Sequence, residues 1–294
     1  MPNADRHDYR RGLAMSALGM VIISPDVLLL RLIQDAGTWD VVFWRMLFQG
    51  TALLGWLALR GERPLARVAR LGRWGWLSAL CLSGGQIGFV LAIENTSAAN
   101  ALVLLATMPL FGAALGWLLL RERVAPRTRF AIAVALAGIL AIFADSLGRG
   151  GALGDAFAVG TALLYAINLV ILRRAGDAIV LPGLAVSGLI AAMVALPQAQ
   201  PLAVPLPDLA ILAWIGLVQL PLALVLFFGG TRFVPAAEVA LMSLIETALG
   251  PYLVWLGVGE VPARAAFFGG ALVIAAIAAN SLLALRPSRR VPQS

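Results

Sequence analysis

The stretch SAANALVLLATMPLFGAALGWLLLRERVA, residues 97–125, shares a pattern with PAAEVALMSLIETALGPYLVWLGVGEVPA, residues 235–263. The two stretches lie 138 residues apart and align without a gap. Alanine and leucine matches are common in so apolar a chain, so the argument rests on rarer residues that keep their order and spacing. These are Gly112 with Gly250, Trp117 with Trp255, and Glu122 with Glu260. The sequence therefore predicts two related halves, residues 1–148 and 149–294.

The composition places these halves in a lipid bilayer. Of the 294 residues, 61% are hydrophobic and only 13% are charged, whereas a soluble domain has about a quarter of its residues charged. A helix needs about 20 mostly apolar residues to cross the hydrocarbon core. The apolar runs predict ten transmembrane helices, at 12–31, 40–59, 74–93, 98–119, 129–146, 152–172, 180–197, 209–229, 235–257 and 265–285. We expect an all-α integral membrane protein with one membrane domain.

Five helices in each half have a consequence for orientation. Because five is an odd number of crossings, the second half enters the membrane upside down relative to the first. Such inverted repeats are typical of carriers whose substrate site lies near the midplane between the halves. Each predicted half is therefore expected to form one side of a midplane cavity.

The arginine residues give the direction of the chain. All 22 basic residues are arginine, and 18 of them fall on one side if the N-terminus is cytoplasmic. The exceptions are Arg31, Arg45, Arg149 and Arg264. Positively charged loops face the cytoplasm, so both termini are predicted to be cytoplasmic. Because the arginines lie in short loops between apolar runs, we interpret the net charge of +7 as topological and expect no nucleic-acid partner.

Several short motifs resemble those of a known family. They are Asn-Thr-Ser-Ala-Ala-Asn-Ala at 95–101, Thr107-Met108-Pro109, the stretch from Trp117 to Glu122, Pro235-Ala236-Ala237-Glu238, Glu246-Thr247 and Gly259-Glu260. With these motifs the chain resembles the drug/metabolite transporter superfamily, EamA type, with two EamA modules covering nearly its whole length. Within it, the chain is most similar to bacterial amino-acid exporters of the YddG type. The resemblance implies export of amino acids, including aromatic ones, across a bacterial inner membrane.

Two segments depart from the family's pattern. The chain has Ile22-Ile23-Ser24-Pro25 where the family usually has Trp-Gly or Trp-Ala near the middle of the first helix. It has Glu246-Thr247 where the ninth helix usually contains Glu-Pro. Both departures fall within candidate pocket segments, so pocket residues have to be argued from this sequence itself.

Polar residues inside the predicted helices are the candidate substrate ligands, because a centred charge costs about 2.5 kcal/mol or more on insertion scales. In the first helix, Ser24 and Asp26 flank Pro25, which removes a backbone donor and frees a carbonyl group. This broken turn could bind a substrate amine. Alternatively, Asp26 lies near the outer interface or pairs with Arg45 of the second helix.

Three further candidates lie in the third and sixth helices. Gln86 is flanked by glycines in SGGQIGF and either faces a cavity or bonds a neighbouring helix. Tyr165 and Asn168 are three residues apart and so share one helix face. They could offer an aromatic wall and an amide to an amphipathic ligand, although an interfacial tyrosine is the alternative.

The last candidates lie in the eighth and ninth helices. Glu246 is central in its apolar run, with Ser243 one turn away, and it could exchange a proton or bind a cation or a substrate amine. A structural role in bonding neighbouring helices is equally compatible with its position. Gln219, two residues before Pro221, resembles another locally unwound polar site.

Other chemistry-bearing residues are interpreted as structural. Glu122 and Glu260 follow helix ends near arginines, and we expect solvated ion pairs there. His7, the only histidine, lies in the N-terminal tail, and Cys81 is the only cysteine. Because these residues form no catalytic triad or metal-ligand set, we expect no metal and no cofactor, and a membrane-embedded enzyme is a weak alternative.

The sequence thus predicts a secondary transporter that exports small amphipathic metabolites by alternating access, and the resemblance implies that these metabolites are amino acids. The alternative within the same superfamily is a cationic drug exporter, in which Glu246 would bind the drug. Exchange, uniport and proton coupling all stay open, as does the oligomeric state. Besides its substrate and the membrane lipid, a proton is therefore a candidate partner.

Overall fold

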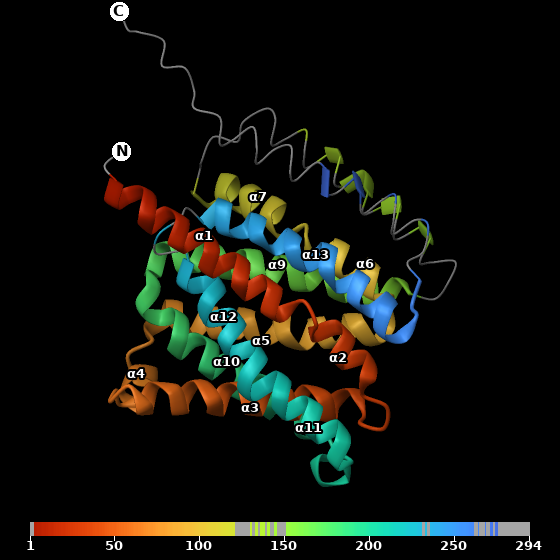
Figure 1. Ribbon diagram of the computed structural model, residues 1–294. Helices are drawn as coiled ribbons and strands as arrows, with labels where there is room; N and C mark the ends of the chain where they lie inside the picture. Colours follow the sequence, from red (N-terminus) through yellow and green to blue (C-terminus); the bar gives the residue numbers. More distant parts are fainter. Residues whose placement is uncertain are drawn as a thin grey trace, which may run out of the picture.

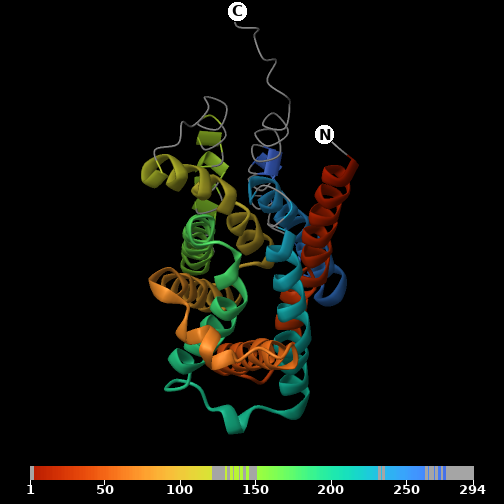
Figure 2. The same cartoon turned by 90° about the vertical axis from the view of Figure 1, so that its left-hand side faces the viewer.

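The computed structural model describes residues 3–120, 151–230 and 236–261, with Phe233 and isolated positions between 130 and 145 and between 264 and 275. Throughout these residues the regular elements are helices, and the long ones run side by side in a bundle (Figure 1 and Figure 2). Of the expected helices 129–146 and 265–285, the structure describes only isolated positions. The count of ten helices, the two halves and their inverted relation therefore stay predictions.

Five described segments are long and apolar enough to cross a membrane. They comprise α1 (Asn3–Ile23) with α2 (Asp26–Leu32), α3 (Thr38–Leu59), α5 (Gly72–Asn95), α9 (Ala152–Ala175), and α11 (Leu206–Trp214) with the π-helix η3 (Ile215–Gln219) and α12 (Leu220–Gly229). Other apolar helices are α6 (Ala98–Leu105), α7 (Met108–Leu120), α10 (Val180–Ala195) and α13 (Ala236–Val258). Short elements are α4 (Pro64–Ala69), η1 (Asp177–Ile179) and η2 (Pro201–Ala203). The chain is therefore a multi-pass helical membrane protein.

Two helices expected to be continuous, the first and the fourth, are interrupted, and the eighth contains a π-helical turn. The first expected helix breaks between α1 and α2 at Pro25, because proline lacks the amide hydrogen that the helix requires. The Gln219 amide donates hydrogen bonds at this break to the carbonyl oxygens of Ile22 (3.0 Å) and Ile23 (3.4 Å). Gln219 itself ends η3, a π-helical turn, and such turns occur often at functional positions. Two irregular segments thus support each other.

The fourth expected helix, 98–119, also breaks in its middle. There α6 ends at Leu105 and α7 begins at Met108. The Thr107 hydroxyl donates to the Leu104 carbonyl at 2.6 Å, and Pro109 occupies the first turn of α7. Proline is well tolerated there because the first amides of a helix have no intrahelical acceptor. The break therefore follows from a motif already visible in the sequence.

Small residues allow the helices to approach closely. A methyl group added at Gly188 of α10 would lie 2.7 Å from the Met46 carbonyl and 2.9 Å from the Gly50 amide of α3. One added at Gly216 would lie 2.6 Å from the Arg45 carbonyl. Close backbone approach through glycine is a typical way of packing membrane helices. These contacts fix α3 between α10 and η3, and Arg45 with it.

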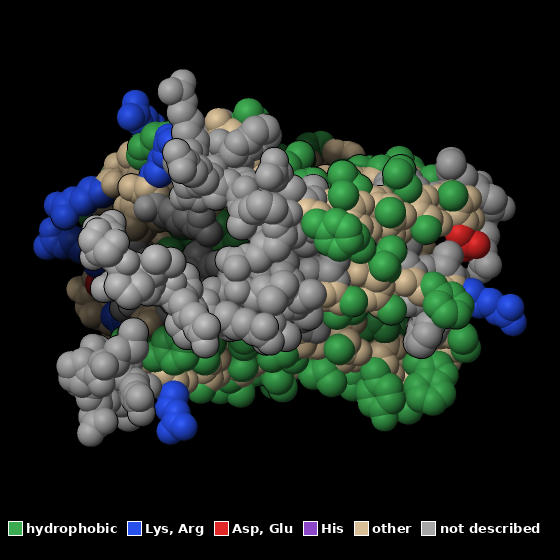
Figure 3. Space-filling view, turned by 90° about the horizontal axis from the view of Figure 1, so that it is seen from above, with side chains coloured by type: hydrophobic (Ala, Val, Ile, Leu, Met, Phe, Trp, Pro, Cys, Tyr) green, Lys and Arg blue, Asp and Glu red, His purple; other side chains and the backbone are tan. Residues whose placement is uncertain are grey.

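The two ends of the bundle differ in charge. We call the end that holds the N-terminus the near end and the opposite one the far end (Figure 1). Figure 3 shows arginine side chains gathered mainly at the near end and hydrophobic side chains along the flank. The same asymmetry underlies the expectation that the near end is cytoplasmic.

Candidate functional site

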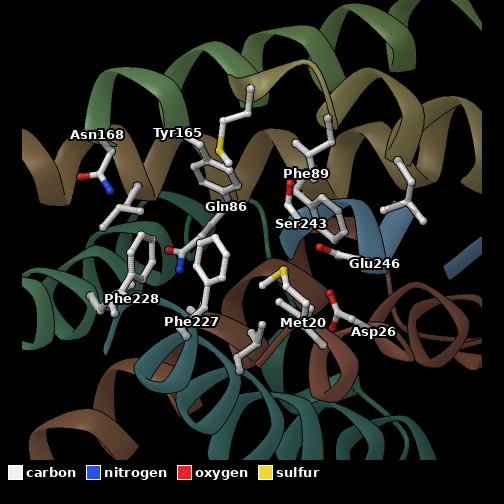
Figure 4. A pocket seen from close by; sticks show the side chains of 18 of the residues that line it. Met20, Asp26, Gln86, Phe89, Tyr165, Asn168, Phe227, Phe228, Ser243 and Glu246 are labelled. Atoms are coloured by element: carbon white, nitrogen blue, oxygen red, sulfur yellow. The ribbon is translucent and has the colours of Figure 1, made fainter. Parts of the chain in front are cut away.

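A cavity of about 100 Å³ lies in the middle of the bundle. A water molecule needs only about 10–15 Å³ by the same kind of measure, so the cavity can hold several. The helices α1, α3, α5, α6, α9, α12 and α13 all contribute to its wall. Among the candidate residues, those that line it are Asp26, Gln86, Tyr165, Asn168, Ser243 and Glu246. The folded chain therefore brings together side chains that are far apart in the sequence (Figure 4).

A buried ion pair forms one side of the cavity. Arg45 Nη2 donates to Asp26 Oδ2 at 2.5 Å, and the two side chains are only 3% and 1% exposed. Asp26 therefore pairs with Arg45, which was one of the alternatives that the sequence left open. Asp26 Oδ1 and Arg45 Nε have no hydrogen-bond partner among the described residues. Each partner thus keeps one buried polar atom available in a cavity wall.

Glu246 supplies a second carboxylate beside this pair. It is 9% exposed, lines the cavity and interacts electrostatically with both Asp26 and Arg45. Figure 4 shows Glu246, Asp26 and Phe89 together at one end of the cavity. No hydrogen bond or ion pair joins Glu246 to another described residue. It is thus a buried carboxylate to which a ligand or a proton could bind.

Two glutamines extend the polar wall. The Gln86 amide donates to Gln49 Oε1 at 3.1 Å, and the Gln49 amide donates to the Leu184 carbonyl at 3.4 Å. This is the interhelical hydrogen bond that was one of the two expectations for Gln86. Because Gln86 also lines the cavity and its Oε1 atom has no partner in the described residues, it fulfils the other as well.

Tyr165 and Asn168 lie farther toward the near end, and Figure 4 shows Asn168 opposite the charged group. Asn168 Oδ1 accepts a hydrogen bond from the Ser78 hydroxyl at 2.6 Å. A methyl group on Gly85 would come within 2.3 Å of the Tyr165 ring, so this glycine leaves the space that the ring occupies. The glycines around Gln86 therefore position an aromatic wall.

The remaining wall is apolar and aromatic. The Phe227 and Phe228 rings contact each other edge to face with centroids 5.1 Å apart, and the Arg45 guanidinium lies 5.4 Å from the Phe89 centroid. Met20 completes this side in Figure 4. A ligand in the cavity would thus meet charged groups at one end and rings along its length, an environment for an amphipathic molecule.

Two candidate residues lie outside the cavity lining. The Ser24 hydroxyl is 1% exposed and donates to the Met20 carbonyl within the same helix, at 2.7 Å. Gln219 holds the broken end of α1 through the carbonyls of Ile22 and Ile23. Gln219 thus satisfies carbonyl groups that the break leaves without an amide donor, whereas the Ser24 hydroxyl adds a second donor to a carbonyl that already accepts from the Ser24 amide.

Sequence reasoning did not select Arg45 and Gln49 as cavity residues. They are four residues apart on α3 and therefore lie on the same helix face. A signal was present, because an arginine within a membrane helix is costly and demands a partner. Which face of α3 turns inward was not visible without its neighbours.

A multi-pass helical protein with a polar central cavity has the features of a membrane transporter. Residues 10–144 match the EamA-like transporter family. Over 251 residues the chain is 28% identical to the "uncharacterized transporter YwfM" of Bacillus subtilis (strain 168), covering 79% of this chain and 80% of that protein. A protein of known crystal structure has the same fold, with a TM-score of 0.68 at 16% identity over 94% of this chain and 98% of that one. Residues 10–144 are thus similar to the EamA-like transporter family, and this match together with the Bacillus subtilis relative supports a membrane transporter.

Proposed function

We propose that the chain exports small zwitterionic metabolites, namely amino acids including aromatic ones, by alternating access around the central cavity. The observation that supports this most directly is a buried arginine beside two buried carboxylates in an otherwise apolar cavity. The membrane is a bacterial inner membrane, with both termini in the cytoplasm. Small-molecule export then runs from the near end to the far end.

The charges match those of an amino acid. Arg45 Nε can donate to a substrate carboxylate, while Asp26 Oδ1 and the Glu246 carboxylate can accept from its ammonium group. Charge-assisted contacts of this kind are about twice as strong as neutral hydrogen bonds. The phenylalanine rings at positions 89 and 227 then surround the side chain. A substrate with both a carboxylate and an ammonium group can bond Arg45 and the two carboxylates at the same time. A substrate with only one of these charges would leave part of this buried set without a partner.

Glu246 is also the residue on which proton coupling would depend. It is the buried carboxylate of the cavity that lacks an arginine partner among the described residues, unlike Asp26. If it alternates between binding a proton and binding the substrate amine, the two occupants compete and their movements are coupled. Coupling by exchange would not require such competition.

A second candidate function is export of cationic drugs. The described charges of the cavity are two carboxylates, Asp26 and Glu246, against one guanidinium, Arg45. With both carboxylates ionised this excess is negative and favours a ligand with a single positive charge. The aromatic rings suit a cation too, because their faces attract positive charge.

Flux into proteoliposomes separates these functions. Uptake of labelled phenylalanine, threonine and methyl viologen is measured with and without a pH gradient, and unlabelled compounds are added as competitors. Saturable phenylalanine uptake that unlabelled amino acids compete supports the proposal, and its response to the gradient decides the coupling. Uptake of viologen alone would establish the drug exporter, and no uptake of any of the three would refute both.

A further inference from the structure

At the far end of the bundle, an ion pair joins two segments that are distant in the sequence. Arg31 lies in the last turn of α2, and Glu260 follows the end of α13. Arg31 Nε and Glu260 Oε2 are 3.0 Å apart, with side chains 26% and 27% exposed. The ion pair expected for Glu260 is therefore present and partly exposed, and its partner Arg31 comes from the first expected helix. Its counterpart Glu122 lies outside the described residues.

Both members of the pair also hold the loop between α5 and α6. Arg31 Nη2 donates to the Thr96 carbonyl at 2.8 Å, and Glu260 Oε1 accepts from the Ala98 amide at 2.7 Å. The Ala98 amide is in the first turn of α6, where amides have no intrahelical acceptor. We call Arg31, Thr96, Ala98 and Glu260 the far-end clamp. It joins three segments at one point.

The backbone at Gly259 makes this arrangement possible. Its φ angle is 71°, in the left-handed region that glycine adopts without strain. The chain therefore turns sharply after Val258, and Glu260 points back toward α6. A residue with a side chain at 259 would adopt this angle only with backbone strain. The clamp therefore depends on glycine at this position.

A second contact joins two segments at the far end, beside the clamp. Asp208, in the first turn of α11, accepts hydrogen bonds at Oδ2 from the amides of Asp35 and Ala36, both at 2.9 Å. Asp208 is 5% exposed. The loop between α2 and α3 is thus fixed to α11 in the same region as the clamp.

The clamp lies on the far-end side of the cavity. Along α13, the twelve helical steps from Glu246 to Val258 span about 18 Å at 1.5 Å per residue. The cavity extends from Glu246 toward Asn168 and Phe228, which lie on the near-end parts of their helices. A substrate that leaves the cavity at the far end has to pass the segments that the clamp joins.

We propose that the Arg31–Glu260 pair is the gate of the far end, and that its separation opens the cavity to that side. This inference rests on the alternating access proposed above. The two residues belong to α2 and the end of α13, which move apart when the gate opens. The loop between α5 and α6 is released at the same time, because each residue holds it through its second contact.

Cysteine accessibility tests the gate without using a substrate. Ala99 is buried beside Glu260, and Cys81 is buried elsewhere in the core. An Ala99→Cys variant in nanodiscs is treated with a polar maleimide, and the labelling of both cysteines is followed by mass spectrometry. Glu260→Gln and Arg31→Gln are each expected to speed labelling at 99 by about threefold to tenfold, as for the loss of a partly exposed charged contact. Labelling of Cys81 stays unchanged.

Two comparisons make the result specific. Glu62 forms an ion pair with Arg67 of α4 at 2.6 Å, and both residues lie between α3 and α5 at the near end. Glu62→Gln makes the same chemical change as Glu260→Gln and is expected to leave labelling at position 99 unchanged. The double variant Arg31→Gln with Glu260→Gln should speed labelling by less than the product of the two single accelerations, because both single variants break the same ion pair.

Each outcome is decisive. Unchanged labelling at position 99 in both single variants overturns the gate, as does equal acceleration at positions 99 and 81, which would indicate a general structural contact. Faster labelling at 99 alone supports the gate. If it is found in a protein that transports none of the tested compounds, the gate stands while the proposed substrate class fails.

Discussion

Breaking the Asp26–Arg45 pair should destabilise the protein far more than breaking a surface pair. Both side chains are almost completely buried, so removing one partner leaves the other charge uncompensated in the bundle. Losses of this kind cost about 3–5 kcal/mol. Arg45→Met and Asp26→Leu are therefore each expected to lower the free energy of unfolding by about 3 kcal/mol or more.

The double variant should behave differently. Arg45→Met together with Asp26→Leu removes both charges, and replacing a buried pair by apolar residues is often neutral. We expect its free energy of unfolding to lie within about 1–2 kcal/mol of the unchanged protein, which corresponds to a coupling energy of several kcal/mol. Although folded, it should lack saturable phenylalanine uptake, because no charged group would remain to bind the substrate carboxylate.

Reversible unfolding in mixed micelles gives the three free energies. The control is Glu62→Gln, which breaks the pair with Arg67, where the side chains are 30% and 45% exposed. A pair so exposed contributes about 0–1 kcal/mol. If Arg45→Met cost no more than this control, the burial argument for the cavity charges would be refuted.

The remaining predictions concern packing and transport. Gly188→Ala should lower the free energy of unfolding by about 1–3 kcal/mol, because its methyl group would lie 2.7 Å from the Met46 carbonyl, whereas Gly160→Ala, with nothing within 4 Å, should not. Thermal unfolding in detergent compares the two, and equal melting temperatures would contradict the packing argument. Glu246→Gln should reduce phenylalanine uptake at least about tenfold and abolish any response to a pH gradient in a folded protein. Asn168→Ala should raise KM about threefold to tenfold in a protein that still folds, although the Ser78 hydroxyl loses its acceptor; unchanged transport kinetics in both variants would refute the site assignment.

The sequence indicated many of the cavity residues because a polar side chain in an apolar helix is costly in lipid and therefore faces a neighbouring helix or a cavity. Glu246, Gln86 and Asn168 were selected on this ground alone, and all three line the cavity. Ser24 and Gln219 were selected by the same rule but donate hydrogen bonds to backbone carbonyls of α1 instead of lining the cavity. Cost of burial identifies a residue that needs a partner, but it does not say whether the partner is a ligand or the protein's own backbone.

By itself, the sequence determined the membrane environment and the positions of the apolar segments, because both depend on the local density of apolar and charged residues. It also supplied Pro25, where the first helix breaks. Only the tertiary structure decided that Arg45 meets Asp26 and that Arg31 meets Glu260. Those pairs depend on which helices are neighbours and which faces they turn inward. That choice follows from close contacts such as Gly50 with Gly188, which involve residues too distant along the chain for any local pattern to connect.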